Sequence, residues 1–207
     1  MCPLRMTGED RKNQIVDTAI RIFSEKGFSG TKTKEIADAV GISEAGIFKY
    51  FATKEELYSA IIDRKADESP HFKFPEKEAR ERNDFMVFLK IADLLLKRHL
   101  KDPSFLRLLY FAALEGHELI QMVYGRYYSK NCRSIAQYIE LRVREKAFSP
   151  VDPSLAARAF VGMIIHYIVS RVIFKDPSIQ SDPSVEPGSF LVKLFLHGIR
   201  NDAGVRS

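Results

Sequence analysis

Hydrophobic residues recur at three- and four-residue intervals along most of this chain, which is the spacing of amphipathic helices. The first such stretch spans residues 11–26, and Gly27 follows it as a typical helix stop that tolerates a positive φ. Its apolar face is formed by Ile15, Ala19, Ile20 and Phe23. Strand-like alternation and Asn-Gly or Asp-Gly hairpin turns do not occur in the sequence, so the pattern predicts an all-α protein.

Two short helices are predicted next, on either side of a glycine. Thr33 is expected to cap the first of them through its hydroxyl, and Gly41 ends it. Ser43 is expected to cap the second, which carries apolar residues up to Phe51. Thr53 begins an S/T-x-x-E capping box, which predicts a fourth helix through residue 62.

The remaining two thirds of the chain also show helical spacing, interrupted by two proline-bearing segments. Residues 68–78 are interpreted as a linker and residues 176–188 as a loop. Ser189 is expected to cap the last helix, which runs to Ile199. Further helices are predicted at 83–100, 104–114, 118–146 and 154–174. The whole pattern predicts about nine helices and no internal repeat.

Composition narrows the class of protein without indicating its function. The chain has 207 residues, of which 45% are hydrophobic, so intrinsic disorder is excluded. Two cysteines, Cys2 and Cys132, cannot build a disulfide framework, and a reducing cytoplasm is the simplest interpretation. The N-terminus has no apolar segment of the signal-peptide type. A net charge of +5 allows a polyanionic partner but does not require one.

The glycine-linked pair of short helices at residues 33–51 suggests a specific chemistry. Two short helices joined by a tight turn form a helix-turn-helix unit, whose second helix lies in the major groove of DNA. Residues 1–54 hold nine Lys and Arg against seven Asp and Glu, a net charge of only +2. The positive charge is local, because four lysines bracket the helix pair: Lys32, Lys34, Lys49 and Lys54.

The stretch from Phe23 to Leu57 resembles the N-terminal DNA-binding domain of the TetR family of transcriptional regulators. It reads FSEKGFSGTKTKEIADAVGISEAGIFKYFATKEEL and matches nearly every position of the family consensus with the correct spacing. Beyond residue 60 the resemblance is one of helical architecture and length. It implies a helix-turn-helix DNA-binding domain at 1–54 and a helical ligand-binding and dimerisation domain at 55–207.

The resemblance also implies which residues contact DNA. Thr33 and Lys54 would meet phosphates at their helix starts, and Lys49 and Tyr50 would face DNA rather than form ordinary helix surface. Glu44 would accept a hydrogen bond from a cytosine amino group or simply favour the helix N-terminus. The full predicted set is Thr33, Lys34, Ser43, Glu44, Ala45, Gly46, Lys49, Tyr50 and Lys54.

Two residues depart from the family pattern. Phe48 stands where many relatives have tyrosine, which removes a phosphate hydrogen bond, and Gly46 shortens the base-reading surface. These departures favour an alternative function, a helical small-molecule-binding protein whose DNA-binding role is weakened or lost.

The C-terminal part of the chain is rich in aromatic side chains. The resemblance implies that it encloses a largely apolar pocket for a small-molecule effector. The alternative is an ordinary hydrophobic core, with His166 as a hydrogen-bonded core or interface histidine. The predicted ligand contacts are Phe105, Tyr110, Phe111, Tyr124, Tyr127, Tyr128, Met163, His166 and Tyr167.

The predicted helix at 154–174 is apolar on nearly all sides. Arg158 and Arg171 interrupt it, so it does not satisfy the requirements of a membrane span and is expected to be buried. By resemblance, the helices near 154–174 and 189–200 would pair with their copies in a homodimer. Two-fold symmetry would then present two recognition helices to a palindromic double-stranded operator.

Enzyme and metal motifs do not occur. The Gly41–Gly46 spacing lacks the Lys-Ser/Thr of a phosphate loop, and neither G-x-S-x-G nor H-E-x-x-H is found. We therefore expect no catalytic residue, metal or cofactor, and an enzyme would require an assembly that the sequence does not reveal. The expected function is a repressor released from its operator by a small apolar or amphipathic inducer, with an activator role left open.

Overall fold

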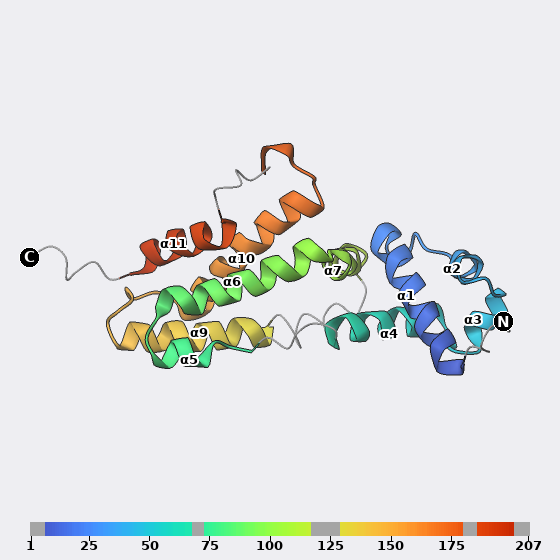
Figure 1. The fold of residues 1–207 in the computed structure, drawn as a ribbon, viewed down its shortest axis with the longest axis horizontal. Helices are drawn as coiled ribbons and strands as arrows, with labels where there is room; N and C mark the ends of the chain where they lie inside the picture. Colours follow the sequence, from blue (N-terminus) through green and yellow to red (C-terminus); the bar gives the residue numbers. More distant parts are fainter. Residues whose placement is uncertain (1–6, 68–72, 117–128, 180–185, 201–207) are drawn as a thin grey trace, which may run out of the picture. The chain divides into compact units, whose positions relative to one another are not determined.

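The structure, a computed structural model, describes residues 7–67, 73–116, 129–179 and 186–200. These ranges contain ten α-helices, one short 3-10 helix and no strand, and an isolated bridge pairs Phe148 with Arg200 (Figure 1). The predicted all-α fold is therefore confirmed.

The helices gather into two compact units, which are described separately. The first joins Met1–Ser69 to Ser104–Val123, and the second joins Pro70–Pro103 to Tyr124–Ser207. The chain thus leaves the first unit, returns to it for one described helix, and leaves it again. A functional boundary after residue 54 stays a prediction, and the helices on both sides of that residue pack together in the first unit.

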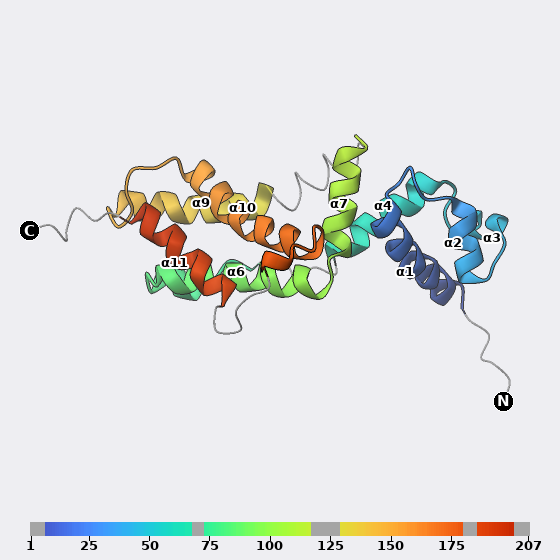
Figure 2. The same ribbon diagram turned by 90° about the horizontal axis from the view of Figure 1, so that it is seen from above.

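Helix α1 (Gly8–Lys26) is the central helix of the first unit, and α2 (Thr33–Val40), α4 (Lys54–Asp67) and α7 (Ser104–Leu114) pack against it. Figure 2 shows α7 beside α4. The short α3 (Glu44–Phe48) packs on α2. The predicted apolar face of α1 is buried in this unit, as Ile15, Ala19, Ile20 and Phe23 show.

Helix α1 begins three residues before its predicted start. The hydroxyl of Thr7 accepts the N–H of Asp10 at 3.1 Å, and the Asp10 carboxylate accepts the N–H of Thr7 at 3.1 Å. This reciprocal capping box satisfies two N–H groups that otherwise lack partners at a helix start. Hydrophobic periodicity does not detect it, because the first turn of α1 is polar on all sides.

The second unit is a bundle of longer helices. Its elements are α5 (Glu76–Arg80), α6 (Asp84–Lys101), α9 (Ser129–Arg144), α10 (Pro153–Val172), a 3-10 helix (Pro177–Ile179) and α11 (Pro187–Ile199). Helix α10 packs against α6, α9 and α11. The contact of α10 with α6 and α11 is filled by Phe88, Phe160 and Phe195, whose ring centroids lie 4.9–5.1 Å apart.

A buried carboxylate joins α6 to α9 in this unit. Asp84 accepts a hydrogen bond from the Tyr138 hydroxyl at 2.6 Å and two from Arg142, at 2.8 and 3.0 Å. These bonds hold the negative charge of Asp84, which is only 8% exposed. They fix the start of α6 against the last turns of α9.

Three predictions of element boundaries were wrong. Helix α5 lies in the segment predicted to be a linker, because five residues that follow Pro75 are too few to show a period. The 3-10 helix lies in the segment predicted to be a loop. The last helix begins at Pro187 with Glu186 as its N-cap, so Ser189 does not cap it. In the predicted 118–146 helix, α9 begins at Ser129 and residues 117–128 lie outside the described ranges.

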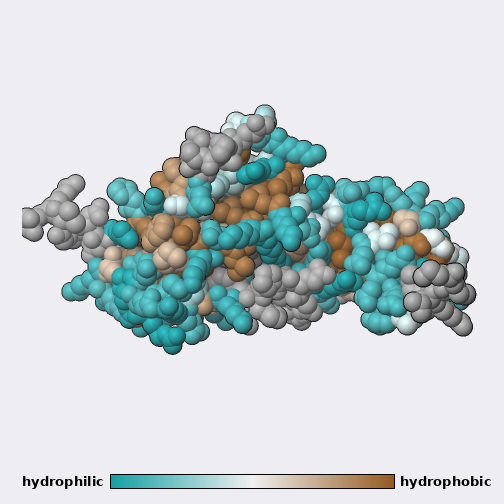
Figure 3. Space-filling view, in the orientation of Figure 1, coloured by the Kyte–Doolittle hydropathy of each residue, from teal (hydrophilic) through white to brown (hydrophobic). Residues whose placement is uncertain are grey.

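Helix α10 buries only one side of its apolar surface in the single chain. Leu155 on α10 is 67% exposed, and Phe190 and Leu194 on α11 are 58% and 54% exposed. Figure 3 shows hydrophobic side chains gathered over this part of the second unit. The helix is long and apolar enough to cross a membrane by composition, but its buried side packs in the bundle, as the core helices of folded domains do.

Candidate nucleic-acid interface

The turn between α2 and α3 has the geometry that the sequence predicts. Gly41 adopts a left-handed conformation with φ +78°, and its N–H and that of Ile42 donate to the carbonyl of Ala37 at 2.9 and 3.0 Å. This arrangement closes α2. The hydroxyl of Ser43 accepts the N–H of Gly46 at 3.1 Å and so begins α3, as predicted.

Buried apolar side chains hold the two short helices together. Ile36, Ala37, Ile47 and Phe51 are at most 2% exposed and form the core of the helix pair. Ala37 is small where α2 and α3 approach each other, so the two backbones can lie close. The result is a compact helix pair whose outer residues remain available to a partner.

Most of the predicted DNA-contact residues are accessible to solvent. They come from the start of α2, from α3 and the turn after it, and from the start of α4. Lys34, Ser43, Glu44, Ala45 and Lys49 are exposed, and Gly46, Tyr50 and Lys54 are partly exposed. Cationic groups at these positions suit phosphate contacts. Their contact with DNA stays a prediction.

Thr33 does not cap α2. The helix begins at Thr33 itself, its N-cap is Lys32, and no side chain caps it. The Thr33 side chain faces the interior, because this residue is 9% exposed. The predicted hydroxyl cap is therefore wrong. A phosphate contact through the backbone N–H groups of this first turn remains the prediction.

Lys49 and Tyr50 lie in the turn after α3 and not on the helix itself. Helix α3 ends at Phe48, and the N–H of Tyr50 donates to the carbonyl of Ile47 at 2.9 Å. Phe48, one of the departures from the family pattern, is 44% exposed. Lys12 of α1 was not predicted as part of this surface, yet its Nζ lies 5.6 Å from the centroid of the Phe51 ring.

Lys54 contacts an aromatic ring of its own unit. Its Nζ lies 4.2 Å from the centroid of the Phe28 ring, a cation–π distance. Burial lowers the pKa of Lys54, while the nearby carboxylates of Glu55 and Glu115 act in the opposite direction. A phosphate contact by Lys54 would therefore compete with this position over Phe28.

The predicted ligand contacts on α7 lie in the first unit. Phe105 is buried and Tyr110 is exposed. The Phe111 ring lies against Gly27, where the Cδ1 atom is 2.7 Å from the position that a Cβ would occupy. Phe111 is thus placed against the end of α1.

The other predicted ligand contacts lie outside this unit. On α10, Met163 and Tyr167 are half-buried and His166 is exposed, and the Tyr167 hydroxyl accepts a hydrogen bond from Arg171 at 3.2 Å. Tyr124, Tyr127 and Tyr128 lie outside the described residues. A ligand role for this set remains a prediction, because its described members are divided between the two units.

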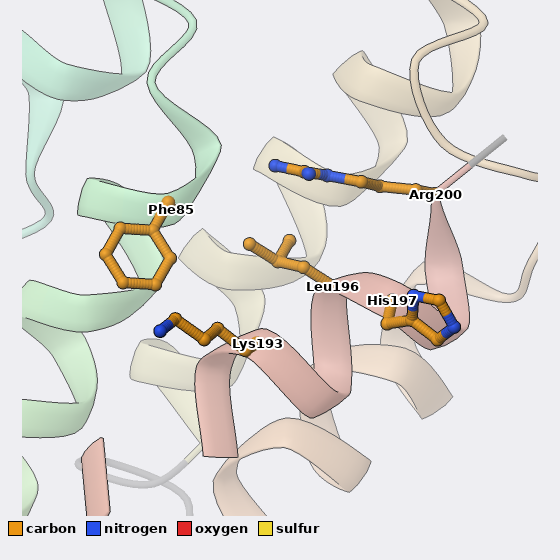
Figure 4. Close-up of a pocket in the computed structure, with 5 residues that line it drawn as sticks. All are labelled: Phe85, Lys193, Leu196, His197 and Arg200. Atoms are coloured by element: carbon orange, nitrogen blue, oxygen red, sulfur yellow. The ribbon is translucent and has the colours of Figure 1, made fainter. Parts of the chain in front are cut away.

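A pocket of about 310 Å³ lies in the second unit between the start of α6 and α11 (Figure 4). Phe85 and Leu196 supply apolar surface, and Lys193 and Arg200 extend on either side of Leu196. His197 completes the lining residues. Such a lining suits an anion with an apolar part. The predicted ligand contacts do not line this pocket.

His99 on α6 is a buried polar residue that the sequence does not single out. It is 5% exposed, and its Nδ1 has no hydrogen-bond partner among the described residues. Burial, with a smaller effect of the Arg98 charge, lowers its pKa to about 4. The imidazole is therefore neutral at pH 7.

Comparison with known proteins places the helix pair in a family. The pattern that defines bacterial regulatory proteins of the tetR family matches residues 15–61. The chain is 38% identical over 52 residues to the negative transcriptional regulator IcaR of the icaADBC biofilm operon in Staphylococcus epidermidis. That similarity covers 25% of this chain and 28% of IcaR.

Similarities that cover more of the chain have lower sequence identity. The chain is 26% identical over 172 residues to the uncharacterized HTH-type regulator YhgD of Bacillus subtilis, which covers 77% of this chain and 83% of YhgD. The structure of AibR in complex with isovaleryl coenzyme A and operator DNA matches 92% of this chain and 98% of that chain. Its TM-score is 0.61 at 19% identity, which shows a shared fold.

Proposed function

Because residues 15–61 belong to the tetR family of bacterial regulatory proteins, we propose that this chain is a DNA-binding transcriptional repressor controlled by a small molecule. The observation that supports it is the α2–α3 unit, whose core is buried while its predicted DNA contacts are accessible. A regulator of this kind acts where the chromosome is, so its proposed compartment is the cytoplasm.

The proposed repressor is a homodimer that binds a palindromic operator. The apolar face exposed on α10 and α11 supports this, since Leu155, Phe190 and Leu194 would be covered by a second copy. Two-fold symmetry would present two α3 helices to half-sites on the same duplex.

The proposed effector is a small apolar or amphipathic molecule that weakens operator binding. AibR, a protein of the same fold, is known in complex with isovaleryl coenzyme A and operator DNA, which supports the proposal that this fold can hold an amphipathic small molecule. The pocket of Figure 4 is compatible with an amphipathic anion, because Lys193 and Arg200 flank apolar surface. By linkage, operator DNA would weaken effector binding by the same factor.

The first prediction concerns Lys34 and Lys49. We expect the double variant Lys34→Ala and Lys49→Ala to bind a duplex from upstream of the protein's own gene at least tenfold more weakly. Its dependence on salt should also fall by about one counterion for each lost phosphate contact. Fluorescence anisotropy at several salt concentrations measures both quantities.

The control is Lys101→Ala, which removes an exposed lysine from α6 in the second unit. Its affinity and salt dependence should match those of the unchanged protein. A double variant with unaltered DNA affinity would instead support the alternative function, a helical small-molecule-binding protein. The exposed Phe48 and the glycine at position 46 are the features that favour that alternative.

A further inference from the structure

The carboxylate of Glu115, just beyond the end of α7, binds the turn that follows α1. Its two oxygens accept the N–H groups of Phe28 at 2.9 Å and Ser29 at 3.1 Å. Hydrogen bonds to an ionised carboxylate are stronger than those between neutral groups. This contact joins residues that are 86 and 87 positions apart in the chain.

A side chain within α7 binds the last turn of α1. Arg107 Nε donates to the carbonyl of Ser24 at 2.6 Å. That carbonyl belongs to the last turn of α1, whose carbonyl groups lack partners within the helix and carry a partial negative charge. Glu115 thus binds N–H groups, and Arg107 binds a carbonyl group, on the same short stretch of chain.

Gly27 makes this close approach possible. It has φ +75°, and a Cβ placed on it would lie 2.6 Å from Glu115 Oε1 and 2.7 Å from Phe111 Cδ1. Both distances are too short for real Cβ contacts. A residue without a side chain therefore stands where α7 meets the end of α1.

The turn held by Glu115 leads directly to Thr33, one of the predicted phosphate contacts. Thr31 donates its hydroxyl to the carbonyl of Gly27 at 2.8 Å, and α2 begins two residues later at Thr33, with Lys32 as its N-cap. Phe28 also lies under the ammonium of Lys54. The start of α2 and the position of Lys54 therefore both depend on the conformation of this turn.

We propose that Glu115 and Arg107 are positioning residues, which hold the turn at residues 27–31 and thereby set the start of α2 for DNA. This inference rests on the proposed function for its consequence in DNA binding. It predicts that an acidic residue, Glu115, strengthens the binding of DNA, which is itself negatively charged. Loss of a negative charge alone would strengthen DNA binding.

The test is Glu115→Ala with Glu25→Ala as the matched control. Glu25 is an exposed acid in the last turns of α1, so both variants remove one negative charge from the first unit. We expect Glu115→Ala to raise hydrogen exchange of the Phe28 and Ser29 amides at least tenfold, as measured by NMR, and Glu25→Ala to leave it unchanged. Glu115→Gln should be intermediate, because one amide oxygen remains as an acceptor.

The DNA measurement uses the same upstream duplex. Glu115→Ala should bind it about five- to twentyfold more weakly, because the predicted phosphate contacts of Thr33 and Lys54 are no longer held in place, and its salt dependence should be no steeper than that of the unchanged protein. Glu25→Ala should bind as well as the unchanged protein or better. Circular dichroism melting shows whether each variant is folded at the assay temperature.

Two outcomes separate this inference from the proposed function. Amide exchange in Glu115→Ala equal to that in Glu25→Ala, or DNA binding by Glu115→Ala as tight as by Glu25→Ala, would overturn the positioning role. If the unchanged protein binds no duplex while Glu115→Ala still releases the two amides, the turn is held as inferred and the proposed function is wrong.

Discussion

At the residue scale, the sequence reveals polar residues that act on their near neighbours in the chain, but not those whose surroundings are set by tertiary packing. His99 stands in the basic run LLLKRHLK, which suggests an exposed residue, yet the fold buries it. Glu115 and Arg107 are equally inconspicuous, because their partners are backbone groups distant in the chain. Ser43 and Gly41, by contrast, act on residues within five positions and were predicted correctly.

We predict that His99 makes the protein less stable in mild acid. Its pKa is about 4 in the folded chain and near 6.5 when unfolded, so the unfolded state binds the proton first as the pH falls. The free energy of unfolding should therefore decrease from about pH 6.5 down to about pH 4, by roughly 3 kcal/mol in total. Urea unfolding at several pH values measures it.

Other titrating groups also change the free energy of unfolding with pH, so the effect of His99 is measured by comparing two variants. His99→Leu should show a shallower decrease between pH 6.5 and pH 4, since its unfolded state gains one proton fewer. His197→Leu removes an exposed histidine from α11 and should retain the full decrease. Identical curves for the two variants would contradict the prediction.

At the element scale, local signals predicted the helix pair well and the short or polar elements poorly. Residues with distinctive local conformations, such as Gly41 and the capping Ser43, mark their own elements. Thr53 also caps α4 as predicted, through the Glu56 N–H at 3.0 Å, although the Glu56 carboxylate accepts from Ala52 and not from Thr53. The five residues of α5 depend on packing against α6, which no local pattern records.

Helix α3 gives a prediction of its own, because Gly46 lies inside it. An added Cβ would have its nearest neighbours at 3.4 Å, on Ile42 and Ser43. Gly46→Ala should therefore stabilise the chain by about 0.5 kcal/mol, since alanine loses less backbone entropy than glycine in a helix. Thermal melting measures the change.

The matched control is Gly41→Ala, where the left-handed φ of +78° opposes a side chain although the space is open. This variant should be destabilised by about 1 kcal/mol. A destabilised Gly46→Ala would show that α3 cannot yield by the few tenths of an ångström that the new methyl group needs.

At the scale of the whole molecule, the sequence predicted the class of fold but not which helices pack together in each of the two units. Periodicity shows which side of a helix is apolar, and it does not show which other helix covers that side. The apolar residues of α10 illustrate this, because Phe160 meets Phe88 and Phe195 while Leu155 on the same helix remains exposed. The predicted ligand contacts likewise fell on helices of two different units.

The exposed face of α10 and α11 predicts an association of two chains. The double variant Leu155→Glu and Leu194→Glu should remain folded, because both side chains are more than half exposed, and should sediment as a monomer. Its DNA affinity should fall at least tenfold, since a single chain offers one half-site contact. Analytical ultracentrifugation and anisotropy measure the two effects.

Leu141→Glu is the control for this pair, because Leu141 is a leucine of α9 that is 38% exposed. It should sediment like the unchanged protein. A dimeric Leu155→Glu and Leu194→Glu variant would place the interface on another surface.

The contribution of α7 to the first unit has a consequence for synthesis on the ribosome. The turn after α1 is complete only when Glu115 is present, and Tyr58 donates its hydroxyl to a carbonyl of α7, that of Leu108, at 3.2 Å. A nascent chain that has exposed its first hundred residues therefore holds every predicted DNA contact but not the helix that steadies them. We therefore expect the helix pair to reach its final conformation only after α7 and Glu115 have been synthesised.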